Sequence, residues 1–317
     1  MRRLIVPAAG LVALVLVALG CGSGSGGASE AAVSVPSLPA RAAGVSGPTL
    51  AAAGDIACPA GLRRSSTQCR QGDTEKVIER LDPDVVAPLG DIQYDRGSLR
   101  DWRTGTYRST WGRFKSRTRP AVGNHEYATG STAGYAGYFG SRAGPRAKYW
   151  YSYNLGSWHV VVLNSNCTIV GCRAGSAQER WLRADLARHR ADCTLAYWHH
   201  PRFSSGLHGN DASVAPLWAT LQRAGADVVL SGHDHSYERF GPQTSTGRAS
   251  PNGIVQFVVG TGGRNNYPII RKRPNSRVRR TFVFGVLELT LGEGEYAWNF
   301  VPVAGLTFTD SGSARCR

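Results

Sequence analysis

Acidic side chains are in short supply in this sequence of 317 residues. Asp and Glu number 22 against 37 Lys and Arg, which gives a formal net charge of +15 at pH 7. Such an excess attracts anions in general, including phosphorylated molecules, nucleic acid and acidic cell envelopes. The charge does not choose among these partners, and the demands of solubility explain it equally well.

The sequence also lacks any CxxC pair, which argues against a zinc cluster built from such pairs. It contains seven cysteines. If Cys21 is set aside as a lipid attachment site, an even number remains, which suits disulfides in an oxidising compartment. Many connectivities are possible. Proximity along the chain favours three pairs, Cys58–Cys69, Cys167–Cys172 and Cys193–Cys316.

The apolar run from Leu4 to Leu19 is too short for a typical membrane-spanning helix. It follows two arginines and ends before a small residue, so residues 1–20 are predicted to be a signal peptide. The stretch 17–21 resembles a bacterial lipoprotein cleavage box with Cys21 as the lipidated residue; ordinary cleavage to a secreted product is the alternative. Residues 21–47, rich in Gly, Ser, Ala and Pro, would form a flexible tether. We therefore expect an exported protein, anchored outside the membrane or secreted.

Apolar runs alternate with helical patterns in the first two thirds of the chain, and strands then follow one another without helices. The strand-like runs are 50–53, 84–89, 119–122, 158–163, 194–198, 227–230, 254–259, 282–291 and 295–303. One helix is predicted to begin after an N-cap at Asp73 or Thr74. Two further helical patterns cover 176–190 and 212–224. This order predicts a mixed α/β (α+β) fold with a mixed sheet, or two packed sheets, and helices outside. Residues 48–317 are expected to form a single domain.

Five of the apolar runs end at a side chain that can bind a metal. These side chains are Asp55, Asp91, Asn124, His199 and His233. In open α/β sheets, ligands gather outside the carboxyl ends of the strands, so the five should converge. Each is a weak signal alone, because a Gly-Asp pair after a strand is usually just a turn. Their joint occurrence, in this order, predicts a metal site.

These segments are similar to the five signature blocks of the calcineurin-like metallophosphoesterases. The blocks are Gly54-Asp55, Gly90-Asp91-Ile92-Gln93-Tyr94, Gly123-Asn124-His125-Glu126, His199 and Gly232-His233-Asp234-His235. Tyr94, the run from Gly232 to Arg239 and the turn from Gly260 to Gly263 resemble the purple acid phosphatase branch in particular. The resemblance covers about Thr49 to Leu291, with Ala57 where the first block commonly has Gly.

The resemblance implies the metallophosphoesterase fold, a β-sandwich of two mixed sheets flanked by helices in four layers. The β-sandwich domain that precedes the catalytic domain in the plant enzymes of this branch has no counterpart in this sequence. We therefore do not expect their dimer architecture and expect a monomer.

A two-metal site is also implied by the resemblance. Asp55, Tyr94 and His235 would hold the first metal and Asn124, His199 and His233 the second, and Asp91 would bridge ions about 3.5–4 Å apart. Tyr has an unperturbed pKa of about 10, so a phenolate ligand favours a hard trivalent ion, Fe(III), in the first site. The second could be Fe(II), Zn(II) or Mn(II). Alternatively, Tyr94 is a packed aromatic and both ions are divalent.

The implied reaction is hydrolysis of a phosphate ester by metal-activated hydroxide. The resemblance places His125 near the leaving group as general acid and His208 at a phosphate contact, with Asn124 also touching substrate. His200 could replace His199 as ligand if the strand register slipped by one residue. Glu126 would either orient His125 or face solvent.

An acid-phosphatase-like phosphomonoesterase is the leading hypothesis. One alternative is a phosphodiesterase of nucleotides or phospholipid headgroups in the same superfamily. The other is a non-catalytic polyanion-binding envelope protein, against which the complete ligand set argues. No specific nucleic-acid partner is expected. The basic run from Arg271 to Arg280 would be either a solvated loop or a rim that attracts anionic substrates.

Overall fold

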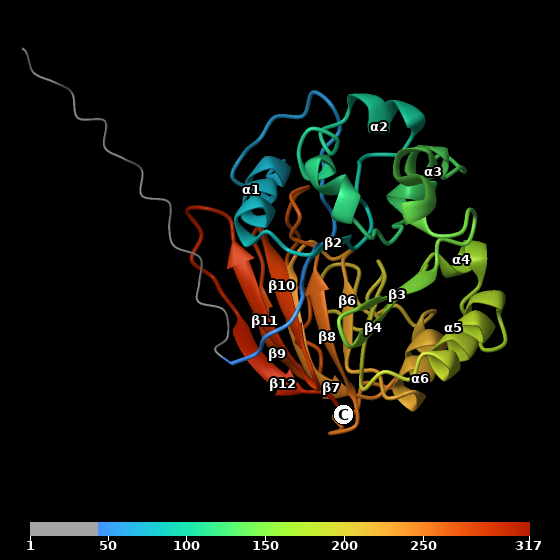
Figure 1. Cartoon of the computed structure of the whole chain (residues 1–317). Helices are drawn as coiled ribbons and strands as arrows, with labels where there is room; N and C mark the ends of the chain where they lie inside the picture. Colours follow the sequence, from blue (N-terminus) through green and yellow to red (C-terminus); the bar gives the residue numbers. More distant parts are fainter. Residues whose placement is uncertain (1–43) are drawn as a thin grey trace, which may run out of the picture. The chain divides into compact units, whose positions relative to one another are not determined.

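Two β-sheets form the centre of the protein in the structure, a computed structural model that describes residues 44–317 (Figure 1). The predictions made for the signal peptide, Cys21 and nearly all of the tether lie outside the described residues.

The larger sheet has seven strands in the order β3-β4-β5-β6-β8-β7-β9. Its central strands β4, β5, β6 and β8 run parallel, and the others pair antiparallel. The strands span Tyr151–Leu155 (β3), Trp158–Val162 (β4), Cys193–Tyr197 (β5), Val228–Ser231 (β6), Tyr237–Gln243 (β7), Ile254–Val259 (β8) and Ser276–Arg280 (β9).

The smaller sheet has five strands in the order β12-β11-β10-β1-β2, with only β1 and β2 parallel. They span Thr49–Ala53 (β1), Val85–Pro88 (β2), Gly285–Gly292 (β10), Glu295–Pro302 (β11) and Ser311–Arg315 (β12). The α-helices are Gln71–Leu81 (α1), Leu99–Thr104 (α2), Ala133–Phe139 (α3), Cys167–Val170 (α4), Ala177–Arg188 (α5) and Ala215–Arg223 (α6).

Alternation along the strands divides the apolar side chains between two cores. On β4, Val160 and Val162 face the core that the two sheets share, whereas Val161 packs with residues of α5 and α6. Helix α1 packs against β10 and β11, on the side of the sheets away from α5 and α6 (Figure 1). The layers are thus helix, sheet, sheet and helices, which confirms the predicted architecture of two mixed sheets flanked by helices.

The differences from the predicted elements lie at edges and ends. The run 119–122 is not a strand, because its one bridge is an isolated pairing of Ala121 with Leu89; the bridge to Val86 of β2 comes from Thr118. Helix α1 begins at Gln71, so Asp73 lies within its first turn rather than at the cap. Strands β3, β7, β9 and β12 were not predicted; β9 and β12 are polar edge strands, and one-sided burial weakens the apolar signal.

Three disulfides are present, and they are the favoured pairs Cys58–Cys69, Cys167–Cys172 and Cys193–Cys316. The last joins the start of β5 to the segment after β12, and so connects the two sheets covalently. Within residues 44–317, none of the helices has the length and apolar character needed to cross a membrane.

Candidate metal centre

Four of the predicted ligands lie in tight turns just beyond the strands β1, β2, β5 and β6. Asp55, Asp91 and His233 have left-handed backbone angles, with φ of 60°, 48° and 71°. The turns are hydrogen-bonded to one another, for example from Asp55 N to Gly90 O at 3.1 Å. Gly90 has to be glycine here, because a Cβ on it would lie 2.6 Å from His199 Nδ1. Close packing of these turns therefore brings the side chains together.

A first group of donor atoms surrounds the Tyr94 hydroxyl. It lies 3.0 Å from Asp55 Oδ1, 3.1 Å from Asp91 Oδ2 and 3.1 Å from His235 Nε2. His235 Nε2 is in turn 3.2 Å from Asp55 Oδ1. These are the residues predicted for the first metal, together with the predicted bridge.

A second group surrounds His199 Nε2, which is buried. It lies 3.0 Å from Asn124 Oδ1, 3.1 Å from Asp91 Oδ2 and 3.2 Å from His233 Nδ1. Asp91 Oδ2 thus belongs to both groups. A carboxylate in this position is able to join two ions.

The chemistry of these atoms fits metal binding. His235 Nδ1 donates to Asn265, and His199 Nδ1 donates to Leu89 O, so the Nε2 atom of each ring faces the group. Burial acts to lower the pKa of His199, but the charge of Asp91 raises it to about 9, so a proton on its Nε2 takes the place that a cation would fill. Adjacent ligands of an octahedral ion with bonds of about 2.1 Å lie about 3 Å apart, which matches the spacing observed in both groups. A cation at each position would bind the lone pairs of these donor atoms.

Electrostatics point the same way. Burial and the charges of Asp55 and Asp91 raise the pKa of Tyr94 well above its ordinary value. Its phenolate therefore forms only beside a strongly charged cation. Burial also acts to raise the pKa of Asp91, but the attraction of His199 and, more weakly, of His125 holds that pKa well below its usual range.

His125 lies at the mouth of the first group. Its backbone N–H donates to Asp91 Oδ1 at 2.8 Å, and its Nδ1 is hydrogen-bonded to Asp95 O. Its Nε2 is 3.8 Å from Asp91 Oδ2, and 33% of its side chain is exposed. The ring therefore faces both the ligand groups and the solvent.

His208 lies beside the second group. Its ring centroid is 4.1 Å from that of His233 and 5.4 Å from that of Tyr267, and the residue is exposed. His200, the alternative ligand, instead places its Nδ1 2.8 Å from Ser165 Oγ. Burial and the charge of His199 lower the pKa of His200 to about 4. His199 Nε2 lies beside Asp91 Oδ2 and Asn124 Oδ1, and a ring nitrogen of His200 also lies within 4.8 Å of one in His199 and one in His233, so the choice between the two histidines stays a prediction.

Glu126 neither orients His125 nor faces solvent, so both expectations for it were wrong. It is buried, and its carboxylate accepts hydrogen bonds from the backbone N–H groups of Asp91, Ile92 and Gly123 at 3.0, 2.8 and 2.8 Å. Burial and the charge of Asp91 raise the pKa of Glu126 to about 7. The residue fixes the turn that carries Asp91.

Other supporting residues were missed from the sequence. Buried Asp234 accepts from the backbone N–H groups of His208 and Gly209, and so fixes the loop that presents His208. Tyr267 stacks on His235 with ring centroids 3.9 Å apart. Asp234 lies inside a recognised sequence block, which is a signal of importance but not of this role. No sequence pattern marks Tyr267.

The basic run is only partly a loop, since it includes strand β9. Arg273 donates from Nε to Ser204 O at 3.1 Å and from its backbone to Ser205 Oγ at 2.9 Å. This part of the run therefore lies against the loop that carries His208.

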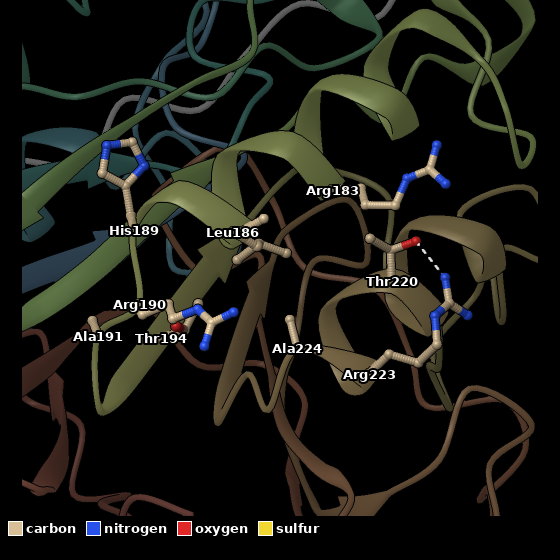
Figure 2. A pocket seen from close by; sticks show the side chains of 10 residues that line it. Arg183, Leu186, His189, Arg190, Ala191, Thr194, Thr220, Arg223 and Ala224 are labelled. Carbon is tan, nitrogen blue, oxygen red and sulfur yellow. Dashed lines mark hydrogen bonds between the residues drawn. The ribbon is translucent and has the colours of Figure 1, made fainter.

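A cavity of about 480 Å³ lies away from these groups, between α5 and α6. Figure 2 shows Arg183, Arg190 and Arg223 around it, with Arg223 hydrogen-bonded to Thr220. None of the predicted metal ligands lines this cavity. We therefore place the candidate site at the two groups of donor atoms and not at this cavity.

Comparisons with known proteins agree with this geometry. Residues 49–237 match the model of the calcineurin-like phosphoesterase family. Purple acid phosphatase 15 of Arabidopsis thaliana is 27% identical over 272 residues, which are 73% of this chain and 49% of that protein. An uncharacterized protein of Mycobacterium tuberculosis is 30% identical over 239 residues, 61% of this chain and 44% of its own length. The chain thus spans about half the length of these relatives, or less.

A solved structure of similar fold is that of the purple acid phosphatase PPD1 from yellow lupin seeds. It has a TM-score of 0.71 at 21% identity and is matched over 86% of this chain and 54% of its own. The two mixed sheets, the donor groups at their strand ends and the family match over 49–237 lead to one conclusion: this chain belongs to the calcineurin-like phosphoesterase family.

Proposed function

We propose that the chain is a phosphatase that hydrolyses phosphate monoesters with two metal ions. The observation that carries the proposal is the position of Asp91 Oδ2, which lies 3.1 Å from both the Tyr94 hydroxyl and His199 Nε2. Because one oxygen belongs to both donor groups, two ions would be close enough to act on one phosphate.

Each residue of the site has a proposed role in metal binding or catalysis. Asp55, Tyr94 and His235 would hold the first ion, Asn124, His199 and His233 would hold the second, and Asp91 would contact both. When bound, such a pair supplies a hydroxide nucleophile near neutral pH and neutralises charge on the phosphoryl oxygens. His125 donates a proton to the departing alcohol, and Asn124 and His208 contact the phosphate.

We assign Fe(III) to the Tyr94 position, because only a hard, highly charged ion would overcome the raised pKa of this phenol. The second position, with two imidazoles and an amide oxygen, suits Fe(II), Zn(II) or Mn(II).

A monoesterase is favoured because several relatives, such as the Arabidopsis protein above, carry the name purple acid phosphatase. The test compares 4-nitrophenyl phosphate with bis(4-nitrophenyl) phosphate in the same metal-loaded enzyme. We expect kcat/KM for the monoester to exceed that for the diester by at least about tenfold. A preference for the diester would assign the chain to the phosphodiesterases, and the absence of any hydrolysis would favour a non-catalytic polyanion-binding protein.

Export is also proposed. It is supported by the three disulfides, which form and persist in oxidising compartments. The signal peptide, the lipid on Cys21, the monomeric state and the extent of the single catalytic domain stay predictions.

A further inference from the structure

A second cavity, of about 430 Å³, opens directly beside the candidate metal centre. Asn124 and His200 form the side nearest the centre. The other walls come from the segment of Tyr127 and Ala128, from residues 165–169 around α4, and from Asp211 and Ser213. Because Asn124 belongs to the second donor group, a phosphate held at the centre would have this cavity as a neighbour.

The walls of this cavity are fixed by bonds of their own. The disulfide Cys167–Cys172 closes the α4 segment. Asn166 Nδ2 donates to Asn164 Oδ1 at 2.9 Å and to Gly123 O at 3.3 Å, which connects α4 to the turn before Asn124. Asn164 Nδ2 lies 2.8 Å from the Tyr127 hydroxyl. The cavity is therefore preformed rather than dependent on a ligand to order it.

Its charge is opposite to that of the chain as a whole. Asp211 is its one carboxylate, and its lining includes no Lys or Arg, although the chain has 37 of these and a net charge of +15. Arg202, which lies nearby in sequence but does not line the cavity, donates to Ser245 O at 2.9 Å and lies over the ring of Phe203. Burial lowers the pKa of Arg202, and the charge of Asp211 acts against this change, so Asp211 attracts this cation from outside the lining.

Asp211 is also able to accept further hydrogen bonds. Its Oδ1 accepts one from Ser213 N at 2.8 Å. A carboxylate has room for several donors on its two oxygens. Thr168 and Ser213 also line this cavity, whereas the Ser165 hydroxyl is bonded to His200. Ile169, which is 58% exposed, adds an apolar surface that a ligand can cover.

We propose that this cavity binds the alcohol part of the phosphate ester and selects alcohols that carry a hydrogen-bond donor, an ammonium or hydroxyl group, over those that carry a second anionic group. This inference rests on the proposed function and adds its substrate class. An ammonium gains from Asp211, whereas a carboxylate or second phosphate would be desolvated next to a like charge with no lining cation to offset it.

The test uses three phosphate monoesters of similar length that differ in the charge of the terminal group. They are 2-aminoethyl phosphate (positive), propyl phosphate (neutral) and 2-carboxyethyl phosphate (negative). For the metal-loaded wild-type chain we expect kcat/KM to fall in that order. Glycerol phosphate, with neutral hydroxyl donors, should be better than propyl phosphate.

Asp211→Asn removes the charge but keeps the shape. It should reduce the ratio of kcat/KM for the aminoethyl and propyl esters by about fivefold, which corresponds to one partly exposed ion pair. The effect should appear mainly in KM. Because the ratio is taken within one variant, a partial loss of folded protein cancels. Asp192→Asn removes an exposed carboxylate at the opposite end of β5 and should leave the ratio unchanged.

Two results would overturn the inference while leaving the proposed function intact. One is hydrolysis of the carboxyethyl ester as efficiently as the aminoethyl ester; the other is an unchanged ratio in Asp211→Asn. If neither these esters nor 4-nitrophenyl phosphate is hydrolysed, the proposed function itself is wrong and the inference fails with it.

Discussion

Asp91 shows how much a single side chain depends on residues that never touch an ion. Its Oδ2 lies between the two donor groups, its Oδ1 accepts from His125 N, and its backbone N–H is held by buried Glu126. Gly123 packs so closely that a Cβ there would lie 2.2 Å from Asp91 Oδ1. The bridging position is thus over-determined by its surroundings, which is what a preorganised site requires.

The ligand candidates could be predicted from the sequence because residue type, position after a strand and order along the chain all agree. The supporting residues could not. A buried Glu126 that accepts four backbone hydrogen bonds has the same sequence appearance as an exposed one, since three of its four partners come from another turn. The contact between Tyr267 and His235 likewise depends on how two distant segments pack.

His125→Ala tests the assignment of the general acid. The variant should keep its metals, because His125 is in neither donor group, and should turn over about 10²–10⁴-fold more slowly on an alkyl phosphate. The deficit should shrink for 4-nitrophenyl phosphate, whose leaving group needs little protonation. Steady-state rates over a series of leaving groups check this. An equal loss for every leaving group would instead place His125 in phosphate binding.

Tyr94→Phe tests the iron assignment. A phenolate bound to Fe(III) absorbs in the visible, so the iron-loaded protein should be coloured, and removal of the oxygen should bleach the band. The ring is buried, and Phe keeps its packing. The visible spectrum measured beside iron content gives the answer. Colourless wild-type protein with stoichiometric iron would show that Tyr94 is not a ligand and would favour two divalent ions.

At the scale of elements, the parallel strands place their carboxyl-terminal turns at one edge of the sheets. The polar edge strands contribute few residues to the core. Strong apolar runs such as β8 were predicted with their observed bounds, 254–259. The run 119–122 was predicted from the same kind of pattern but is not a strand, because its one bridge is an isolated pairing of Ala121 with Leu89. Whether an apolar run forms a strand depends on its pairing with other strands in three dimensions, which a local sequence pattern does not show.

A polar cluster also joins elements away from the candidate centre. His159 on β4 lies with its Nε2 2.8 Å from Asp185 Oδ2 on α5, and Ser152 on β3 donates to Asp185 Oδ1 at 2.9 Å. Burial acts to raise the pKa of Asp185, but the hydrogen bonds from His159 and Ser152 hold it below its ordinary value. The cluster thus stabilises the contact between α5 and the edge of the larger sheet while Asp185 is charged.

Asp185→Asn should therefore lower the free energy of unfolding by about 2 kcal/mol at pH 7. A carboxyl whose pKa is lower in the folded state stabilises the fold above its unfolded pKa of about 3.9, and this contribution is lost as the pH falls through the folded value. The difference between the variant and the wild type should thus narrow below about pH 4. Thermal melts from pH 3 to 8 check this, with Asp192→Asn as a control; a pH-independent difference would contradict it.

At the scale of the whole molecule, the excess of positive charge differs in its effect from the local arrangement of charged side chains. A net charge of +15 draws anions to the surface without choosing among them. We propose that selection among anions takes place in the region where the basic segment around Arg273 lies on the His208 side of the centre and the acidic cavity of Asp211 lies on the Asn124 side. Composition could not have revealed this division, because it arises from the placement of a few loops.

We propose that Asp91 contacts two metal ions in one hydrolytic centre, and this is tested by the metal content of the purified chain measured beside phosphate release. Wild-type protein should hold two equivalents of metal per chain and hydrolyse 4-nitrophenyl phosphate. Asp91→Ala, checked for folding by circular dichroism, should lose both metal and activity, because Asp91 Oδ2 is the oxygen that lies 3.1 Å from both the Tyr94 hydroxyl and His199 Nε2. An Asp91→Ala protein that keeps two metals and turns over at a near-normal rate would contradict the account.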